Sequence, residues 1–181
     1  GYAPPEAAQA TVAWGIAATT ATPARPLRVR WCETMAAASP ATAGLKTLCR
    51  LDQVLARAEW HDPAVDEGLM TSTDGWLIGG TAGNVFLVAE GRVLTPAVDR
   101  AGIAGVMRRF IIQVAAEAGL DVRVCDLAPA AVASAGEIFL SNALHGIRPV
   151  HAVGSRQLAP GPVTARLVAL LAAAGVVECA G

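Results

Sequence analysis

The side chain with the most distinctive chemistry is Lys46, in the stretch GLKTLCRLDQVLARAEW (44–60). The chain has fourteen lysines and arginines, and Lys46 is the only lysine among them. Arginine provides positive charge alone, whereas a lysine amine can lose its proton and act as a base or a covalent nucleophile. Lys46 is therefore a candidate catalytic residue, and the alternative is a solvated surface lysine.

A second candidate site lies in TPAVDRAGIAGVMRRF (95–110), where Gly102 and Gly105 precede an amphipathic helix. The first turn of a helix presents unpaired N–H groups and a partial positive charge, which together suit a phosphate. The alternative is a tight turn that serves only packing. The spacing matches neither a nucleotide phosphate loop nor a dinucleotide fingerprint.

Polar residues also follow an apolar strand in LSNALHGIRPV (140–150), namely Ser141, Asn142 and His145. Proteins with α/β folds often place ligand-binding groups at such strand ends, although a solvated loop is the simpler alternative. Glu137 is the first residue of the same expected strand, and its carboxylate is either an acid–base group or a structural one.

The composition describes a globular protein with a small-molecule partner. Its 181 residues suit one domain, and 54% are hydrophobic while 16% are charged. The net charge of -1 gives no excess of positive charge that would bind nucleic acid or an anionic membrane. No apolar run reaches the roughly 18 residues that a membrane-spanning helix needs. The cysteines and histidines lack metal-ligand spacing, so we expect no metal site, no disulfide framework and a reducing cytoplasm.

The periodicity predicts a mixed α/β or α+β fold with a mixed sheet. We expect a linker over residues 3–10 and a helix from Leu45, because apolar residues recur with helical spacing from there, which puts Lys46 at the helix start. The other expected helices cover 102–119, 129–135 and 161–175. The expected strands cover 11–17, 26–33, 68–73, 76–84, 85–90, 92–96, 121–127, 137–141 and 149–153, with a loop over 142–148.

Four segments in order carry a family resemblance: AGLKTLCRLDQVLARAEW, GGTAGNVFLV, TPAVDRAGIAGVMRRF and EIFLSNALHGIRPV. Together they resemble the 4-amino-4-deoxychorismate lyases, which are fold-type IV pyridoxal-phosphate (PLP) enzymes related to branched-chain and D-amino-acid aminotransferases. The resemblance runs from Gly1 to about Leu171 and implies a mixed sheet or pseudo-barrel with flanking helices. The implied reaction eliminates pyruvate from 4-amino-4-deoxychorismate and leaves 4-aminobenzoate for folate biosynthesis.

The resemblance also implies roles for individual residues. Lys46 would form the Schiff base with PLP, and the backbone N–H groups of Val106 and Met107 would hold the cofactor phosphate. Ser141 and Asn142 would face that phosphate from the opposite loop. One departure concerns the family pattern EGT-x-x-N-x-F, whose glutamate faces the pyridine nitrogen of PLP, because Gly79 occupies the matching position here.

The resemblance further implies a domain division and an assembly. Residues 1–30 would be an interdomain linker and first strand, residues 31–181 would be the PLP-binding large domain, and the family's small N-terminal domain would be absent. The family's assembly is a homodimer. Two other functions stay open, a class IV aminotransferase acting on branched-chain or D-amino acids and an inactive fragment that binds no PLP.

Overall fold

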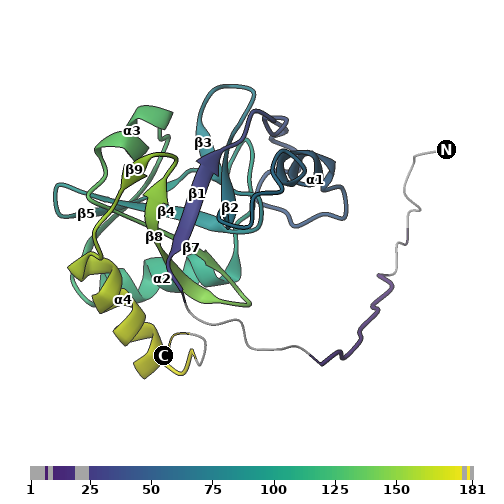
Figure 1. The fold of residues 1–181 in the computed structure, drawn as a ribbon. Helices are drawn as coiled ribbons and strands as arrows, with labels where there is room; N and C mark the ends of the chain where they lie inside the picture. The colour runs from purple at the N-terminus through teal and green to yellow at the C-terminus, as the bar shows by residue number, and fades with distance from the viewer. Residues whose placement is uncertain (1–6, 8–9, 19–24, 177–178, 180–181) are drawn as a thin grey trace.

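The computed structural model describes residue 7 and residues 10–18, 25–176 and 179, and these form one curled mixed sheet with helices packed around it (Figure 1). The strands are Leu27–Trp31 (β1), Glu67–Thr71 (β2), Leu77–Gly80 (β3), Asn84–Ala89 (β4), Arg92–Pro96 (β5), Asp121–Cys125 (β6), Glu137–Asn142 (β7), Gly146–Val153 (β8) and Arg156–Gln157 (β9). The helices are Leu51–Arg57 (α1), Val106–Glu117 (α2), Pro129–Ser134 (α3) and Pro162–Ala173 (α4).

The sheet has the strand order β3-β2-β1-β8-β7-β4-β5-β6, and β9 pairs with β8. The β1–β2, β1–β8 and β5–β6 pairs are parallel, whereas the remaining pairs are antiparallel. The expected mixed sheet with flanking helices is therefore confirmed. At one edge of this sheet, β3, β5 and β7 end and β4 and β8 begin, so the loops at that edge lie close together.

Two central strands are buried on both faces. Val85 and Leu87 of β4 point into the core inside the curl, whereas Phe86 and Val88 point to the opposite core. Residues alternate between the faces of a strand, so a strand covered on both sides is apolar throughout. The ring of Phe86 stacks on that of Phe139 in β7 with 4.8 Å between the ring centroids.

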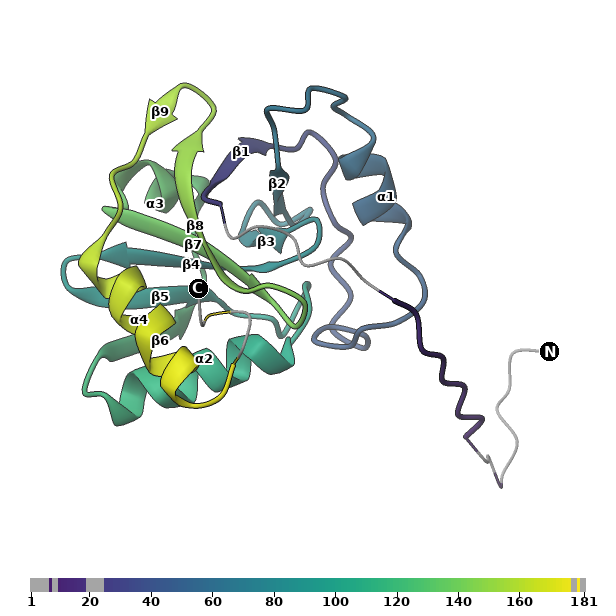
Figure 2. The same ribbon diagram turned by 60° about the horizontal axis from the view of Figure 1, so that its bottom comes forward.

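Helices α2 and α4 cover the face of the sheet that carries Phe86 and Phe139 (Figure 2). Helix α3 packs against the other core, and the short helix α1 lies beside β2 and buries only Ala56. None of the helices in the described part of the chain has both the length and the apolar character needed to cross a bilayer.

Two expectations about the N-terminal part of the chain were wrong. The helix expected from Leu45 begins only at Leu51, so Lys46 lies in an irregular segment before α1. Residues 11–17 were expected to form a strand, but they are irregular, and Trp14 and Ile16 are 85% and 92% exposed.

The loop expected over 142–148 is shorter than predicted, because strand β8 already begins at Gly146. The linker expected over 3–10 lies mostly outside the described residues.

Candidate functional site

The segment that carries Lys46 is hydrogen-bonded to the chain that enters α2. The N–H of Gly44 donates to the carbonyl of Gly102 at 3.0 Å, and the N–H of Ala104 donates to the carbonyl of Gly44 at 2.9 Å. This bridge lies two residues before Lys46 and three residues before Val106, the first residue of α2. Lys46 is exposed, and its amine makes no hydrogen bond or ion pair with the residues that the structure describes.

The N-terminus of α2 is not capped by a side chain. Gly105 is the N-cap residue, and its carbonyl accepts the N–H of Arg109 as the first bond of the helix. The N–H groups of Val106 and Met107 therefore have no acceptor within the helix. A hollow with a volume of about 250 Å³ opens at this end of α2 and includes Gly105, Val106 and Arg109 in its wall.

Two side chains fix the position of this helix end. The Nδ2 of Asn84, the first residue of β4, donates to the carbonyl of Ile103 at 2.8 Å. The buried guanidinium of Arg108 donates to the carbonyl of Pro96 at 2.8 Å, and burial lowers its pKa. A Cβ on Gly105 would overlap the amide oxygen of Asn84, so a larger residue there would displace the side chain that holds the carbonyl of Ile103.

Ser141 lies opposite Asn84 in the β4–β7 ladder, on the face covered by α2. The residue is 3% exposed, and its hydroxyl oxygen has no hydrogen-bond partner among the residues that the structure describes. Buried hydroxyl groups in proteins are nearly always paired, so an unpaired one close to an uncapped helix terminus calls for an explanation such as a bound ligand.

Asn142, the next residue, has a side chain that is already engaged within the protein. Its Oδ1 accepts the N–H groups of Leu144 and His145 at 3.0 and 2.9 Å, and its Nδ2 donates to the carbonyl of Ala82 at 3.2 Å. Asn142 thus connects the β7–β8 loop to the β3–β4 turn. Of the two residues expected on this loop, Ser141 is the one with a free hydrogen-bonding group.

Gly79 lies in β3 opposite Met70, with a φ of 152° that strongly favours glycine. A Cβ built at this position would lie 2.9 Å from the carbonyl oxygen of Gly83, so the backbone of the β3–β4 turn occupies the space of a side chain. The carboxylate of Glu67 holds the same turn, since it accepts the N–H and hydroxyl of Thr81 and the N–H of Ala82.

Glu137 lies at the opposite end of β7 from Ser141. Its carboxylate accepts the N–H groups of Val163 and Thr164 at the start of α4 and the hydroxyl of Thr164. These contacts make Glu137 a structural carboxylate. No cluster of three or more metal-ligating side chains occurs within the described residues.

Sequence reasoning did not select Asn84, Glu67 or Arg148 as site residues. Asn84 stands within GGTAGNVFLV, whose resemblance to a family was the available indication. Arg148 likewise stands within EIFLSNALHGIRPV, whereas Glu67 had no such indication, because its hydrogen-bond partners in the β3–β4 turn follow it by many residues and meet it only when the strands pair.

Comparison with known proteins identifies the family of this chain. The family model described as amino-transferase class IV matches residues 1–153. This chain belongs to the class IV aminotransferases. An aminodeoxychorismate lyase of Vibrio harveyi is 31% identical to this class IV chain over 131 residues, which are 72% of this chain and 48% of that protein. A branched-chain-amino-acid aminotransferase of Escherichia coli K12 is 31% identical over 120 residues, which are 65% of this chain and 39% of that protein.

Solved structures show the same relationship. The crystal structure of 4-amino-4-deoxychorismate lyase from Pseudomonas aeruginosa superposes with a TM-score of 0.78 at 39% identity, over 81% of this class IV chain and 54% of that chain. A branched-chain aminotransferase of Thermoproteus uzoniensis superposes with a TM-score of 0.82 over 90% of this chain, and its 20% identity supports the fold alone. The chain spans about half the length of the relatives that it matches.

Proposed function

We propose that this chain is the cofactor-binding part of a PLP-dependent lyase that converts 4-amino-4-deoxychorismate to 4-aminobenzoate and pyruvate. The observation that carries the proposal is the meeting of three features at one edge of the sheet. These are the uncapped N-terminus of α2, the unpaired buried hydroxyl of Ser141 and the segment that carries Lys46. A bound phosphate would accept hydrogen bonds both from the N–H groups at this helix end and from the Ser141 hydroxyl.

The residues present suit PLP in their chemistry. The N–H groups of Val106 and Met107, with the hydroxyl of Ser141, would hold the phosphate, and Lys46 would hold the cofactor covalently through its amine. When bound, PLP supplies an electron sink that stabilises negative charge on the amine-bearing carbon of the substrate. The free amine of Lys46 would accept the proton from that carbon.

Two observations favour a lyase over an aminotransferase. The identity to the Pseudomonas aeruginosa lyase is 39%, compared with 28% to the Escherichia coli branched-chain aminotransferase structure. Gly79 also stands where the family resemblance implies a glutamate that would face the ring nitrogen of PLP, and we infer that an elimination driven by aromatisation would need this carboxylate less than transamination would.

The same proposal extends to the whole protein. Residues 31–181 would form the large PLP-binding domain, residues 1–30 would lead into it, and a small N-terminal domain and a second copy of the chain would complete the site. The four cysteines are free thiols, which is compatible with a cytoplasmic location.

The proposal is tested by incubating the purified chain with PLP, reducing with borohydride and mapping the adduct by mass spectrometry. We expect the adduct on Lys46 and none in Lys46→Arg, which keeps the charge but has no amine to react. An unmodified Lys46 in the presence of excess cofactor would refute the proposal and favour a fragment that binds no PLP.

A coupled assay then separates the two activities. A lyase releases pyruvate from 4-amino-4-deoxychorismate with no oxo acid added, whereas an aminotransferase requires an oxo acid as amine acceptor. Turnover of a branched-chain amino acid that depends on an added oxo acid, without pyruvate release, would establish the aminotransferase instead.

A further inference from the structure

A pocket with a volume of about 190 Å³ lies at the edge of the sheet where β2 and β8 begin and β7 ends. The residues that line it are Leu27, Asp66, Glu67, Ala82, Gly83, Leu140, Ser141, Asn142, His145 and Arg148. Ser141 is thus common to this pocket and the candidate cofactor site, although its hydroxyl oxygen is buried and lies on the face covered by α2. The pocket is smaller than the roughly 300–1,000 Å³ of ordinary ligand sites, so it suits one end of a substrate.

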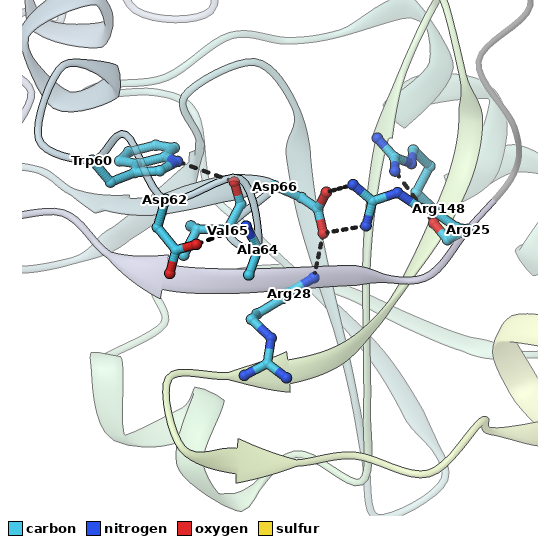
Figure 3. Close-up of polar contacts among 8 residues, drawn as sticks. All are labelled: Arg25, Arg28, Trp60, Asp62, Ala64, Val65, Asp66 and Arg148. Carbon is cyan, nitrogen blue, oxygen red and sulfur yellow. Dashed lines mark hydrogen bonds and ion pairs between the residues drawn. The ribbon is translucent and has the colours of Figure 1, made fainter.

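The two acidic residues of this pocket are already paired. Asp66, whose side chain is 6% exposed, accepts the guanidinium of Arg25 and the backbone N–H of Arg28, as Figure 3 shows. Glu67 accepts the N–H groups of Gly68, Thr81 and Ala82 and the hydroxyl of Thr81. Neither carboxylate needs a further donor from the pocket.

Arg148 differs from these residues because most of its donors are unused. Its side chain comes from β8, is half-buried, and donates a single hydrogen bond, from Nη2 to the carbonyl of Arg25 at 3.3 Å (Figure 3). A guanidinium has five N–H donors in a planar fork, and no other partner for them occurs among the described residues. Burial lowers the pKa of Arg148, and the nearby Asp66 partly opposes this effect.

A half-buried guanidinium with free donors is best satisfied by a planar anion that accepts two parallel hydrogen bonds. We propose that Arg148 binds a carboxylate of the substrate in this pocket and thereby orients the substrate beside Ser141 and the cofactor. The identity of that substrate, a ring with two carboxylates, rests on the proposed function. Recognition of a carboxylate by Arg148 rests on the pocket itself.

The test is the binding of chorismate, which carries the same two carboxylates with a hydroxyl in place of the amine. Isothermal titration of chorismate into the PLP-treated chain would compare the unchanged protein with Arg148→Gln and Arg148→Lys. We expect Arg148→Gln to weaken binding at least about tenfold, because it removes a charge-assisted bidentate contact. Arg148→Lys should recover part of this loss, since it restores the charge without the fork, and it also serves if the glutamine variant does not fold.

Arg28→Gln is the matched control. Arg28 stands on the neighbouring strand β1, and its side chain points away from Asp66 and Arg148 (Figure 3). Its substitution removes one positive charge near the pocket without changing the lining, so binding should stay within about twofold. An equal loss in Arg28→Gln would mean that overall charge, and not Arg148, controls binding.

The outcomes separate this inference from the proposed function. Chorismate binding that is unchanged in Arg148→Gln, or absent in the unchanged protein, would overturn the role of Arg148 even if PLP labels Lys46. Chorismate binding that depends on Arg148 in a chain whose Lys46 is never labelled would support the pocket and refute the PLP proposal.

Discussion

The role of Glu137, structural or catalytic, can be tested by substitution. The residue is 9% exposed, and its Oε1 accepts the N–H of Val163 at 3.0 Å. Its Oε2 accepts the N–H and the hydroxyl of Thr164, both at 2.7 Å. The N-cap residue of α4 is Gly161, which has no side chain, so Glu137 caps the helix from a neighbouring strand.

Glu137→Gln keeps the shape of the side chain but has one oxygen for three donors. Its amide oxygen can keep the two bonds from Thr164, so the variant loses the charge and the bond from Val163, and the two remaining bonds become neutral ones. A bond to a charged group contributes about 1.5–3 kcal/mol, whereas a neutral bond contributes about 0.5–1.5 kcal/mol. We therefore expect the free energy of unfolding to fall by about 3 kcal/mol, which is a large share of the roughly 5–15 kcal/mol of an ordinary domain. Urea denaturation followed by circular dichroism should show the midpoint lowered by about 1–3 M.

Thr164→Val removes only the hydroxyl bond and is the matched comparison. It should cost less than Glu137→Gln, and the double variant should cost less than the sum of the two, because both substitutions affect one shared contact. The assignment would be refuted if Glu137→Gln left the urea midpoint unchanged but abolished pyruvate release. That result would make Glu137 an acid–base group.

Two further predictions concern Gly79 and Cys32. Gly79→Ala should lower the free energy of unfolding by more than Gly75→Ala does, as measured by urea denaturation, because both have positive φ but only Gly79 meets a backbone carbonyl at 2.9 Å. Equal losses would contradict the steric argument. Burial, followed by the charge of Glu59, raises the pKa of Cys32 from 9.0 to about 12. Because this folded-state pKa is raised, the thiol's contribution to stability is complete below pH 9.0 and declines as pH rises toward about 12. Unfolding measured across this range should show a loss that Cys32→Ser reduces, and an identical pH dependence in both proteins would contradict it.

The doubly buried strands could be predicted from the sequence, whereas the start of α1 could not. VFLVA and IFL are continuous apolar runs, and β4 and β7 formed where such runs predict them. The leucines from Leu45 also have helical spacing, yet Leu48 is 102% exposed and the helix begins at Leu51. Gly44, just before this segment, pairs with Ile103, and a pairing so distant in sequence leaves no local pattern.

In the candidate site, too, the sequence could predict only features that depend on neighbouring residues in the chain. The sequence indicated Lys46 by its rarity and the N-terminus of α2 by its glycines, because both are local properties of the chain. Residues 11–17 had the alternation of a strand, but a strand also needs an edge to pair with, and these residues pair with none in the described part of the chain. The partners of Arg148 and Glu67 likewise became visible only once the strands were in place.

The backbone at Gly79 limits which side chains this position can carry. The φ of Gly79 and the nearby carbonyl of Gly83 mean that a glutamate could enter only if the β3–β4 turn moved. That turn is held by Glu67 from one side and by Asn142 from the other, and Asn142 also orders the loop after Ser141. Restoring the family carboxylate would therefore disturb the wall of the pocket that contains Arg148. The loss of the glutamate and the shape of this edge of the sheet are thus coupled, and a single substitution at Gly79 cannot reverse one without altering the other.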